Sequence, residues 1–223
     1  MGTILLVRHS QASFGSGDYD VLSDLGARQT QALYDSLHVR GVHGDVLVSG
    51  SLRRQIDTAR PWTDGGLELG LDPRWDEYDA AAVLDAHGVA MASLERRDEY
   101  APPLSSREFQ EILDRALHSW VATGEDASQN ASWPVFRARA SAAVQALAGE
   151  LDRGQTGMAF TSGGVIAAIC VAVLGLDEQS FVALNRVAIN AAVTKLVTGR
   201  SGTTLVSFNE HAHLEREGLV SYR

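Results

Sequence analysis

A histidine and an arginine stand together near the start of the chain, directly after an apolar run. The run is Thr3-Ile-Leu-Leu-Val7, and Arg8-His9 follow it. An imidazole is one of the few side chains that can act as a covalent nucleophile near neutral pH. The guanidinium beside it is always charged, and its fork of N–H donors suits phosphate oxygens. The pair alone is weak evidence, since any strand can end in a polar dipeptide, so its surroundings must be considered.

The elements that would position this pair follow an alternating pattern. Short apolar runs stop at small or polar residues, as buried central strands do, and helical patterns lie between them. Such alternation predicts an α/β fold with a mainly parallel sheet, here a three-layer α/β/α architecture. Strands are expected at Thr3–Arg8, Asp45–Ser49, Met158–Thr161, Ala192–Val197 and Thr204–Phe208.

Capping residues mark the limits of several helices. Gly163–Leu174 is apolar nearly all round, which predicts a buried helix, and Cys170 within it is expected to serve packing. Three more helices are bounded by start and stop signals: Ser23 or Asp24 to near Gly41, Ser105–Glu108 to Gly124, and Pro134 to about Leu151.

Polar residues gather just beyond the ends of the expected strands. Ser49–Ala59 follows the second strand and enters a helix, and Thr161–Gly164 follows the third and opens the buried helix. Strand-to-helix turns of small residues offer backbone N–H groups and positive helix ends, which suit an anion. Because the carboxyl ends of parallel strands meet at one edge, these turns are expected to lie beside Arg8 and His9.

One part of the chain interrupts the alternation. From about residue 67 to 133 no clear parallel-strand signal is present, and the stretch holds three of the four tryptophans. We expect a single domain over residues 1–223, with 67–133 as a helical insertion near the active site. The insertion is either a lid over a site or a plain connecting subdomain, and the sequence leaves both open.

The motifs taken together resemble the histidine phosphatase superfamily, whose fold is that of phosphoglycerate mutase. The resemblance covers essentially the whole chain, in order, and Gln11–Ser23 is similar to one branch of that superfamily. Its motifs match this chain at Arg8-His9-Ser10, Leu52-Arg-Arg54-Gln-Ile-Asp-Thr58-Ala59, Glu77, Ser162-Gly163-Gly164 and Asn209-Glu-His211-Ala-His213-Leu214.

The resemblance implies a phosphomonoester hydrolase that works through a phosphohistidine on a small phosphorylated metabolite, without a metal ion or cofactor. His9 would attack phosphorus, while Arg8 and Arg54 would hold the phosphoryl oxygens together with Ser162 and Gly163. Glu77 would protonate the leaving oxygen and then activate water. Asp76 and Asp79 compete with Glu77 for that role.

This chain departs from the family pattern at two positions. Ser10 stands where the family has glycine, and Ser162 stands where it has a second histidine. Because the loss of one transition-state donor costs about 100- to 1000-fold in rate, the resemblance implies a slow enzyme. The candidate accessory residues are Ser10, Gln11, His211 and His213, and either of these two histidines could replace the missing imidazole.

Three other functions remain open. A catalytically weak or inactive member would only bind phosphorylated ligands. A mutase would need further basic residues, for which Arg96, Arg97 and Arg107 are available. A serine hydrolase with Ser162 as nucleophile is the weakest alternative, because Phe160–Gly164 lacks the first glycine of G-x-S-x-G.

The composition limits partners and location. The formal net charge of −9 argues against a general nucleic-acid or anionic-membrane binder, so a phosphate site must be a local positive pocket. A single cysteine excludes an internal disulfide and a cysteine-based metal site. The N-terminus has no signal-peptide pattern, which favours a cytoplasmic protein. The apolar stretch Val182–Val193 either packs internally or forms a homodimer face.

Overall fold

The centre of the molecule is a six-stranded sheet with the strand order β3-β2-β4-β1-β5-β6. The computed structural model describes residues 1–13, 20–87, 106–123 and 132–222, with only the backbone of residues 106 and 107. The strands are β1 (Gly2–Arg8), β2 (Val46–Ser49), β3 (Leu69–Leu71), β4 (Thr156–Thr161), β5 (Val193–Gly199) and β6 (Gly202–Glu210).

The sheet is mostly parallel, as the sequence predicts. β1 pairs in parallel with β4, and β2 pairs in parallel with both β4 and β3. β5 runs antiparallel to β1, and β6 returns antiparallel to β5. The carboxyl ends of β1, β2 and β4 therefore lie next to one another, where the turns rich in polar residues begin.

The expectation that residues 67–133 hold no strand of the sheet was wrong at its start. Leu69–Leu71 forms β3, and Leu47 to Ser49 pair with it residue by residue. A strand of three residues with a central glycine at the edge of a sheet has neither the apolar run nor the alternation that marks a strand in sequence. The helical part of this segment therefore begins after β3.

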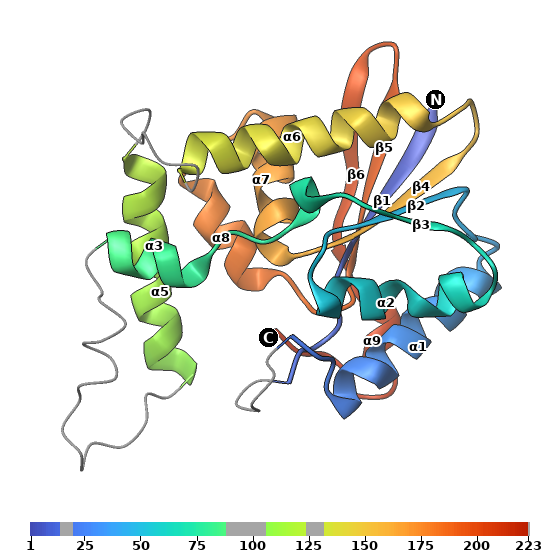
Figure 1. The fold of residues 1–223 in the computed structure, drawn as a ribbon, viewed down its shortest axis with the longest axis horizontal. Coiled ribbons are helices and arrows are strands. Elements are labelled where there is room, and N and C mark those ends of the chain that lie inside the picture. Colours follow the sequence, from blue (N-terminus) through green and yellow to red (C-terminus); the bar gives the residue numbers. More distant parts are fainter. Residues whose placement is uncertain (14–19, 88–105, 124–131, 223) are drawn as a thin grey trace.

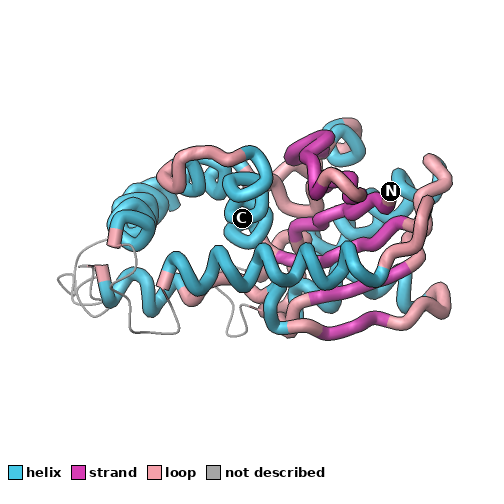
Figure 2. The backbone as a smooth tube through the Cα atoms, turned by 90° about the horizontal axis from the view of Figure 1, so that it is seen from above, coloured by secondary structure: helices cyan, strands magenta, loops and turns pink. Residues whose placement is uncertain are grey.

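Helices cover both faces of the sheet. In Figures 1 and 2, α6 and α7 lie over one face, and α1 and α2 lie over the other. The helices are α1 (Asp24–Val39), α2 (Arg53–Asp64), α3 (Ala80–Ala86), α5 (Ser106–Ala122), α6 (Trp133–Glu150), α7 (Gly163–Leu174), α8 (Ser180–Val187) and α9 (Ala212–Glu215), with a 3-10 turn at Pro73–Trp75.

The alternation of side chains along β1 divides the core into two layers. Ile4 and Leu6 belong to the cluster beneath α6 and α7, whereas Leu5 and Val7 belong to the cluster beneath α1 and α2. Both faces of the central strand are thus buried, as expected for a three-layer α/β/α fold. Cys170 is fully buried, and burial raises the pKa of its thiol to about 12, in agreement with a packing role.

The helix signals in the sequence mostly coincide with helix ends. Ser23 caps α1 by accepting from the Gly26 N–H at 3.0 Å, and Pro134 lies in the first turn of α6. Gly175 ends α7 in the left-handed conformation, with φ of 61°. The capping box proposed at Ser105–Glu108 and the stop at Gly124 rest on residues outside the described ranges.

An aromatic cluster joins the helices beside the sheet to its core. Trp120 of α5 contacts Tyr78 at 5.4 Å between ring centroids and Trp133 at 5.5 Å. Trp133 in turn packs against Phe181 at 4.6 Å. Trp120 and Trp133, both from the 67–133 stretch, thus pack against one another, and Trp120 places α5 next to the segment that carries Glu77.

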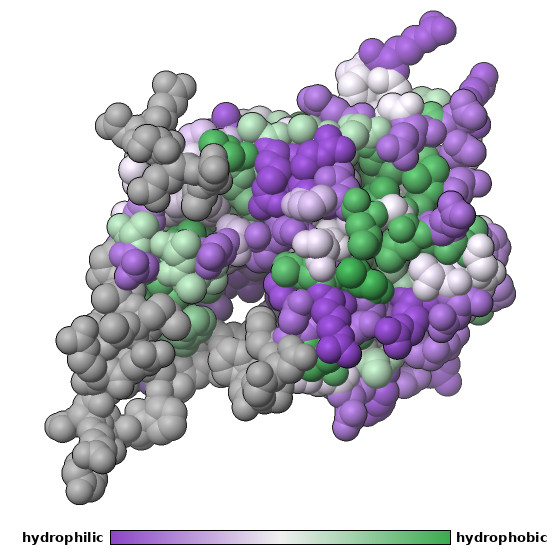
Figure 3. All heavy atoms as spheres, in the orientation of Figure 1, coloured by the Kyte–Doolittle hydropathy of each residue, from purple (hydrophilic) through white to green (hydrophobic). Residues whose placement is uncertain are grey.

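The surface shows where the molecule is hollowed. Figure 3 shows hydrophilic residues over α6 and α2, and a hollow beside the N-terminal end of α2.

The apolar stretch Val182–Val193 packs internally at Val182, Ile189 and Val193, which are all buried. Among the described residues, no helix has the length and apolar character needed to cross a bilayer.

Candidate active site

The turn after β1 holds His9 by its backbone. The His9 N–H donates to the carbonyl of Thr161 at 2.8 Å, which extends the β1–β4 ladder by one bond. The His9 carbonyl accepts from the Asn190 amide at 3.1 Å and from the Ala191 N–H at 3.3 Å. This histidine is therefore fixed by the central strand, its parallel neighbour and the segment before β5.

The His9 imidazole is buried, with 5% of the residue exposed, and both ring nitrogens have partners. Nδ1 lies 2.8 Å from the Ser10 carbonyl, which can only accept, so Nδ1 carries the proton. Nε2 therefore carries the lone pair, and it accepts from Arg54 Nε at 3.2 Å. Burial, aided by the charges of Arg8 and Arg54, holds the His9 pKa well below its usual value of 6.5. The ring is thus a neutral base with its lone pair turned toward a guanidinium.

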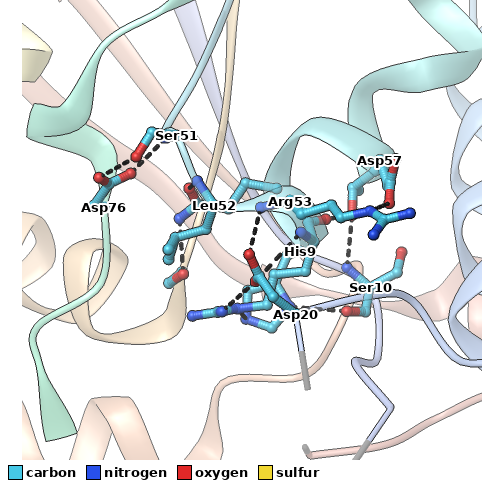
Figure 4. A network of polar contacts seen from close by, with 12 residues as sticks. His9, Ser10, Asp20, Ser51, Leu52, Arg53, Asp57 and Asp76 are labelled. Carbon is cyan, nitrogen blue, oxygen red and sulfur yellow. Dashed lines mark hydrogen bonds and ion pairs between the residues drawn. The ribbon is translucent and has the colours of Figure 1, made fainter. Parts of the chain in front are cut away.

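Arg54 comes from the first turn of α2 and also pairs with Asp20. Its Nη1 lies 2.6 Å from Asp20 Oδ1, and Asp20 Oδ2 accepts from the Arg53 N–H at 2.7 Å. Figure 4 shows Asp20 lying over His9 at this helix end. The Asp20 carboxylate thus occupies the N-terminal end of α2 and one side of Arg54, the position in which an anion would be held. Asp20 could not be predicted from the sequence, because a lone aspartate in a loop carries no signal.

The Arg8 guanidinium, whose charge also acts on His9, is bound to two chain segments. Its Nη1 donates to the carbonyl of Ala188 and, at 3.3 Å, to that of Tyr222. A Cβ atom at Gly163 would lie 3.3 Å from Arg8 Nε, so the first residue of α7 is close to this guanidinium. The charges of both arginines therefore act on the imidazole, and Gly163 lies beside Arg8.

Hydrogen bonds attach residues 219–222 to the elements that hold the turn of His9. The buried amide of Gln29 donates to the Leu219 carbonyl at 2.7 Å and to the Ser221 hydroxyl at 2.8 Å. The Ser221 carbonyl accepts from the Asn190 N–H at 2.9 Å. Because Asn190 also binds His9, the segment from Leu219 to Tyr222 supports the histidine turn and Arg8 together.

Glu77 is held at the N-terminal end of α7. Its Oε2 accepts from the Gly164 N–H at 3.2 Å, and its Oε1 accepts from the Tyr78 N–H at the same distance. Burial raises the pKa of this carboxyl, although the Gly164 N–H and the charges of Arg54 and Arg8 oppose the shift. A Cβ atom at Gly164 would lie 2.3 Å from Glu77 Oε1, so only glycine admits the carboxyl here.

The two acids that compete with Glu77 in the sequence are engaged elsewhere. Asp76 accepts from the Ser51 N–H at 2.5 Å and from the Ser51 hydroxyl at 2.6 Å. Asp79 caps α3 by accepting from the Ala82 N–H at 3.0 Å. Of the three, Glu77 is the one placed at the N-terminus of α7, the helix that begins beside Arg8.

The two positions that depart from the family pattern are both fully buried. Ser10 donates its N–H to the Thr58 hydroxyl at 3.0 Å, and its own hydroxyl lies 2.7 Å from that of Thr30. Ser162 is the N-cap residue of α7, and its Oγ accepts from the Gln55 amide at 2.9 Å. In this structure both hydroxyls have hydrogen-bond partners within the protein.

The hydrogen bonds found for the other accessory candidates go to groups other than the His9 imidazole. Gln11 receives a hydrogen bond from Ser23 at 2.8 Å. His213 Nε2 lies 3.0 Å from the Ala191 carbonyl, and His211 Nδ1 lies 2.6 Å from the Asn209 carbonyl. Through Ala191, His213 braces the backbone next to His9, and burial lowers its pKa.

The side chains of the three arginines considered for a mutase are outside the described part of the chain. Arg96 and Arg97 lie outside the described residues, as does the side chain of Arg107. Within the described residues, no group of three or more histidine, cysteine, aspartate or glutamate side chains is arranged to hold a metal ion.

Solved structures with the same fold cover nearly the whole chain. A variant of phosphoserine phosphatase from Entamoeba histolytica, in complex with phosphoserine, has a TM-score of 0.65 at 16% identity over 96% of this chain and 100% of its own. Mycobacterial glucosyl-3-phosphoglycerate phosphatase has a TM-score of 0.64 at 23% identity, over 94% and 99%. YhfR of Bacillus stearothermophilus has a TM-score of 0.68 at 18% identity, over 96% and 100%. At these identities the likeness establishes the fold.

The family is established by the sequence itself. No curated protein matches the chain. Residues 4–211, from β1 to the turn before α9, match the histidine phosphatase superfamily, branch 1. Because this match covers nearly the whole chain, the chain belongs to the histidine phosphatase superfamily.

Proposed function

We propose that this protein is a phosphomonoester hydrolase that acts through a phosphohistidine on a small phosphorylated molecule, without a metal ion. The observation that carries the proposal is the state of His9. Its proton is on Nδ1, its lone pair is on Nε2, and Arg54 lies 3.2 Å from that nitrogen. A neutral imidazole beside a guanidinium is suited to attack a phosphoryl group whose oxygens the guanidinium holds.

In the first step, a bond forms between His9 Nε2 and phosphorus while the bond from phosphorus to the ester oxygen breaks. Arg54 and Arg8 neutralise the charge on the non-bridging oxygens. Asp20 leaves Arg54 as the phosphoryl group arrives, because both are anions for the same guanidinium. Glu77, whose pKa is raised by burial, gives its proton to the leaving oxygen.

In the second step, the Glu77 carboxylate takes a proton from water, and the water oxygen attacks phosphorus. The bond from phosphorus to Nε2 breaks, so inorganic phosphate leaves and the neutral His9 and the protonated Glu77 are restored. One carboxyl group thus serves first as acid and then as base. The Gly164 N–H supports it in the charged state between the two steps.

The replacement of a family histidine by Ser162 makes this a slow member in our proposal. The Ser162 hydroxyl is shorter than an imidazole and the residue is fully buried against Gln55, so in our proposal it does not replace the donor that the family histidine supplies. The loss of one such donor lowers turnover by about 100- to 1000-fold. The same observation favours the second candidate, a protein that binds phosphorylated ligands through Arg8 and Arg54 without turnover.

A panel of phosphomonoesters, with p-nitrophenyl phosphate and small sugar phosphates, distinguishes the two. The assay contains EDTA and compares wild type with His9→Ala and Arg54→Ala. Activity that survives EDTA and disappears in both variants would support the hydrolase. Phosphate binding that needs Arg54, together with no turnover above the His9→Ala background, would instead support the binding protein.

A further inference from the structure

Gln55 lies next to Arg54 on α2, at a position that the family motif leaves unspecified. The residue is fully buried, although glutamine is usually found at the surface. A buried amide must satisfy two donors and an acceptor, and unsatisfied groups are costly. Its partners therefore indicate what this side chain does.

The Gln55 amide joins two segments that approach each other only in the folded chain. Nε2 donates to the Trp75 carbonyl at 3.1 Å and to the Ser162 hydroxyl at 2.9 Å. On its other side, Oε1 lies 3.4 Å from the Leu52 N–H. A carbonyl only accepts, so the Trp75 oxygen fixes which end of the amide is the donor.

The first of these segments leads directly to Glu77. The Trp75 carbonyl, two residues before the acid, also accepts from the Thr161 hydroxyl at 2.6 Å. Arg139 of α6 donates to the carbonyls of Pro73 at 2.6 Å and of Asp76 at 2.8 Å. The backbone before Glu77 is thus tied to α2, β4 and α6.

The second segment is the N-terminus of α7, which holds the carboxyl group itself. Ser162 is the N-cap residue, and the Gly164 N–H two residues later donates to Glu77 Oε2. Gln55 therefore connects the backbone that carries Glu77 to the helix end that receives its carboxyl group. The fit allows little movement, since a Cβ atom at Gly50 would lie 2.0 Å from Gln55 Oε1.

We infer that Gln55 is a positioning residue for Glu77, holding the general acid at a fixed place relative to His9 and Arg54. The inference rests on the proposed function, because it assigns Glu77 the proton transfer. Within one helical turn, α2 would then supply a ligand of the phosphoryl group and the support of the acid. A displacement of about 1 Å at a reacting group can cost about 100-fold in rate.

The leaving group provides a readout that a merely structural role would not change. An alkyl alcohol is a poor leaving group and needs protonation, whereas p-nitrophenolate leaves without it. Gln55→Met keeps the length of the side chain and removes its hydrogen bonds. We expect it to lower kcat/KM for an alkyl phosphate by about 10- to 100-fold, and that for p-nitrophenyl phosphate by less than about threefold.

Three further variants complete the test. Thr161→Val removes the other side-chain donor to Trp75 and should shift the ratio of the two kcat/KM values in the same direction, even if Gln55→Met does not fold. Gln31→Leu, on the exposed side of α1, should leave the ratio unchanged. In a Glu77→Gln background, Gln55→Met should add no further selectivity.

The outcomes separate this inference from the proposed function. Equal losses on both substrates in Gln55→Met and Thr161→Val, with an active wild type, would overturn the positioning role and leave the hydrolase intact. Wild type that does not exceed the His9→Ala background on either substrate would overturn both.

Discussion

At the scale of the residue, burial acts in opposite directions on the two groups that we propose to be catalytic. It lowers the pKa of His9 and raises that of Glu77, since it disfavours the charged form of each. The same cause therefore moves His9 toward the unprotonated imidazole and Glu77 toward the protonated carboxyl. This is the pairing that phosphoryl transfer from an ester to an imidazole requires.

The pH dependence of kcat/KM should follow from these shifts. On the acid side, activity falls only at a pH well below 6.5, where His9 takes up a proton. On the alkaline side, activity toward an alkyl phosphate falls as Glu77 loses its proton, at a pH above its ordinary 4.5. Steady-state rates measured from pH 4 to 9 would show both limbs.

The variant Glu77→Gln assigns the alkaline limb. It cannot donate a proton, so kcat/KM for the alkyl phosphate should fall by about 100- to 10,000-fold, and the alkaline limb should disappear. An alkaline limb that persists in this variant would show that another group titrates there.

At Gly164, one added methyl group should disturb the Glu77 carboxyl and the packing around it, whereas the same change at an open glycine should not. In Gly164→Ala the new Cβ atom would lie 2.3 Å from Glu77 Oε1 and 2.6 Å from the Tyr78 ring, so both stability and turnover should fall. Gly149→Ala, in α6 with open space around it, should raise the free energy of unfolding by about 0.5–1 kcal/mol. Urea unfolding and rate measurements on both variants test this; equal behaviour would contradict it.

At the scale of the element, the site is made by three strand ends and the helices that follow them. β1 delivers Arg8 and His9, β2 leads into α2 with Arg54, and β4 leads into α7 at Ser162. Parallel pairing brings these ends together, and each helix presents its N-terminus to the same place. Glu77 follows the 3-10 turn after β3. Hydrogen bonds hold this segment between α2 and α7.

Asp20 should matter to α2 both as a cap and as a partner of Arg54. Asp20→Ala removes the acceptor of the Arg53 N–H, and we expect a loss of about 0.5–2 kcal/mol in the free energy of unfolding. Phosphate should inhibit this variant more tightly, because the carboxylate no longer competes for the guanidinium. Denaturant unfolding and the inhibition constant of phosphate are the measurements.

A second capping aspartate provides the control. Asp79→Ala removes the cap of α3 and should cost similar stability without changing inhibition by phosphate. Tighter inhibition in both variants, or in neither, would show that Asp20 does not compete for the anion position.

The sequence predicts what depends on local pattern and misses what depends on tertiary contact. β1, β2 and β4, the N-cap Ser23 and the buried helix α7 carry their own periodicity or capping signals, and the structure contains them. β3 was missed because it is short and lies at an edge, as was the role of Gln55, whose partners are 20 and 107 residues away. Likewise, what separates Glu77 from Asp76 in the structure is tertiary contact, with Gly164 for Glu77 and with Ser51 for Asp76.

At the scale of the whole molecule, a site for an anion lies within a protein of net charge −9. The surface repels a phosphate ester at long range, while the two arginines attract it at short range. Salt screens the first interaction more than the second, because buried groups are screened less.

The rate of substrate capture should therefore rise with ionic strength. We expect kcat/KM for a small dianionic ester to increase by about twofold or more between 0.01 and 0.15 M salt, where the Debye length falls from about 30 to about 8 Å. The value of kcat at saturation should stay constant. A decrease in kcat/KM would show that the local field of the arginines dominates.

The hydrogen bonds that hold residues 219–222 next to the turn of His9 have a consequence for the synthesis of the protein. Leu219 and Ser221 are held by Gln29, and Tyr222 is held by Arg8, so segments far apart in the sequence meet beside His9. During synthesis, His9 leaves the ribosome long before residues 219–222, which support its turn. The site that we propose would therefore be completed only after translation has passed residue 222, and a stalled nascent chain that lacks these residues would carry the histidine without that support.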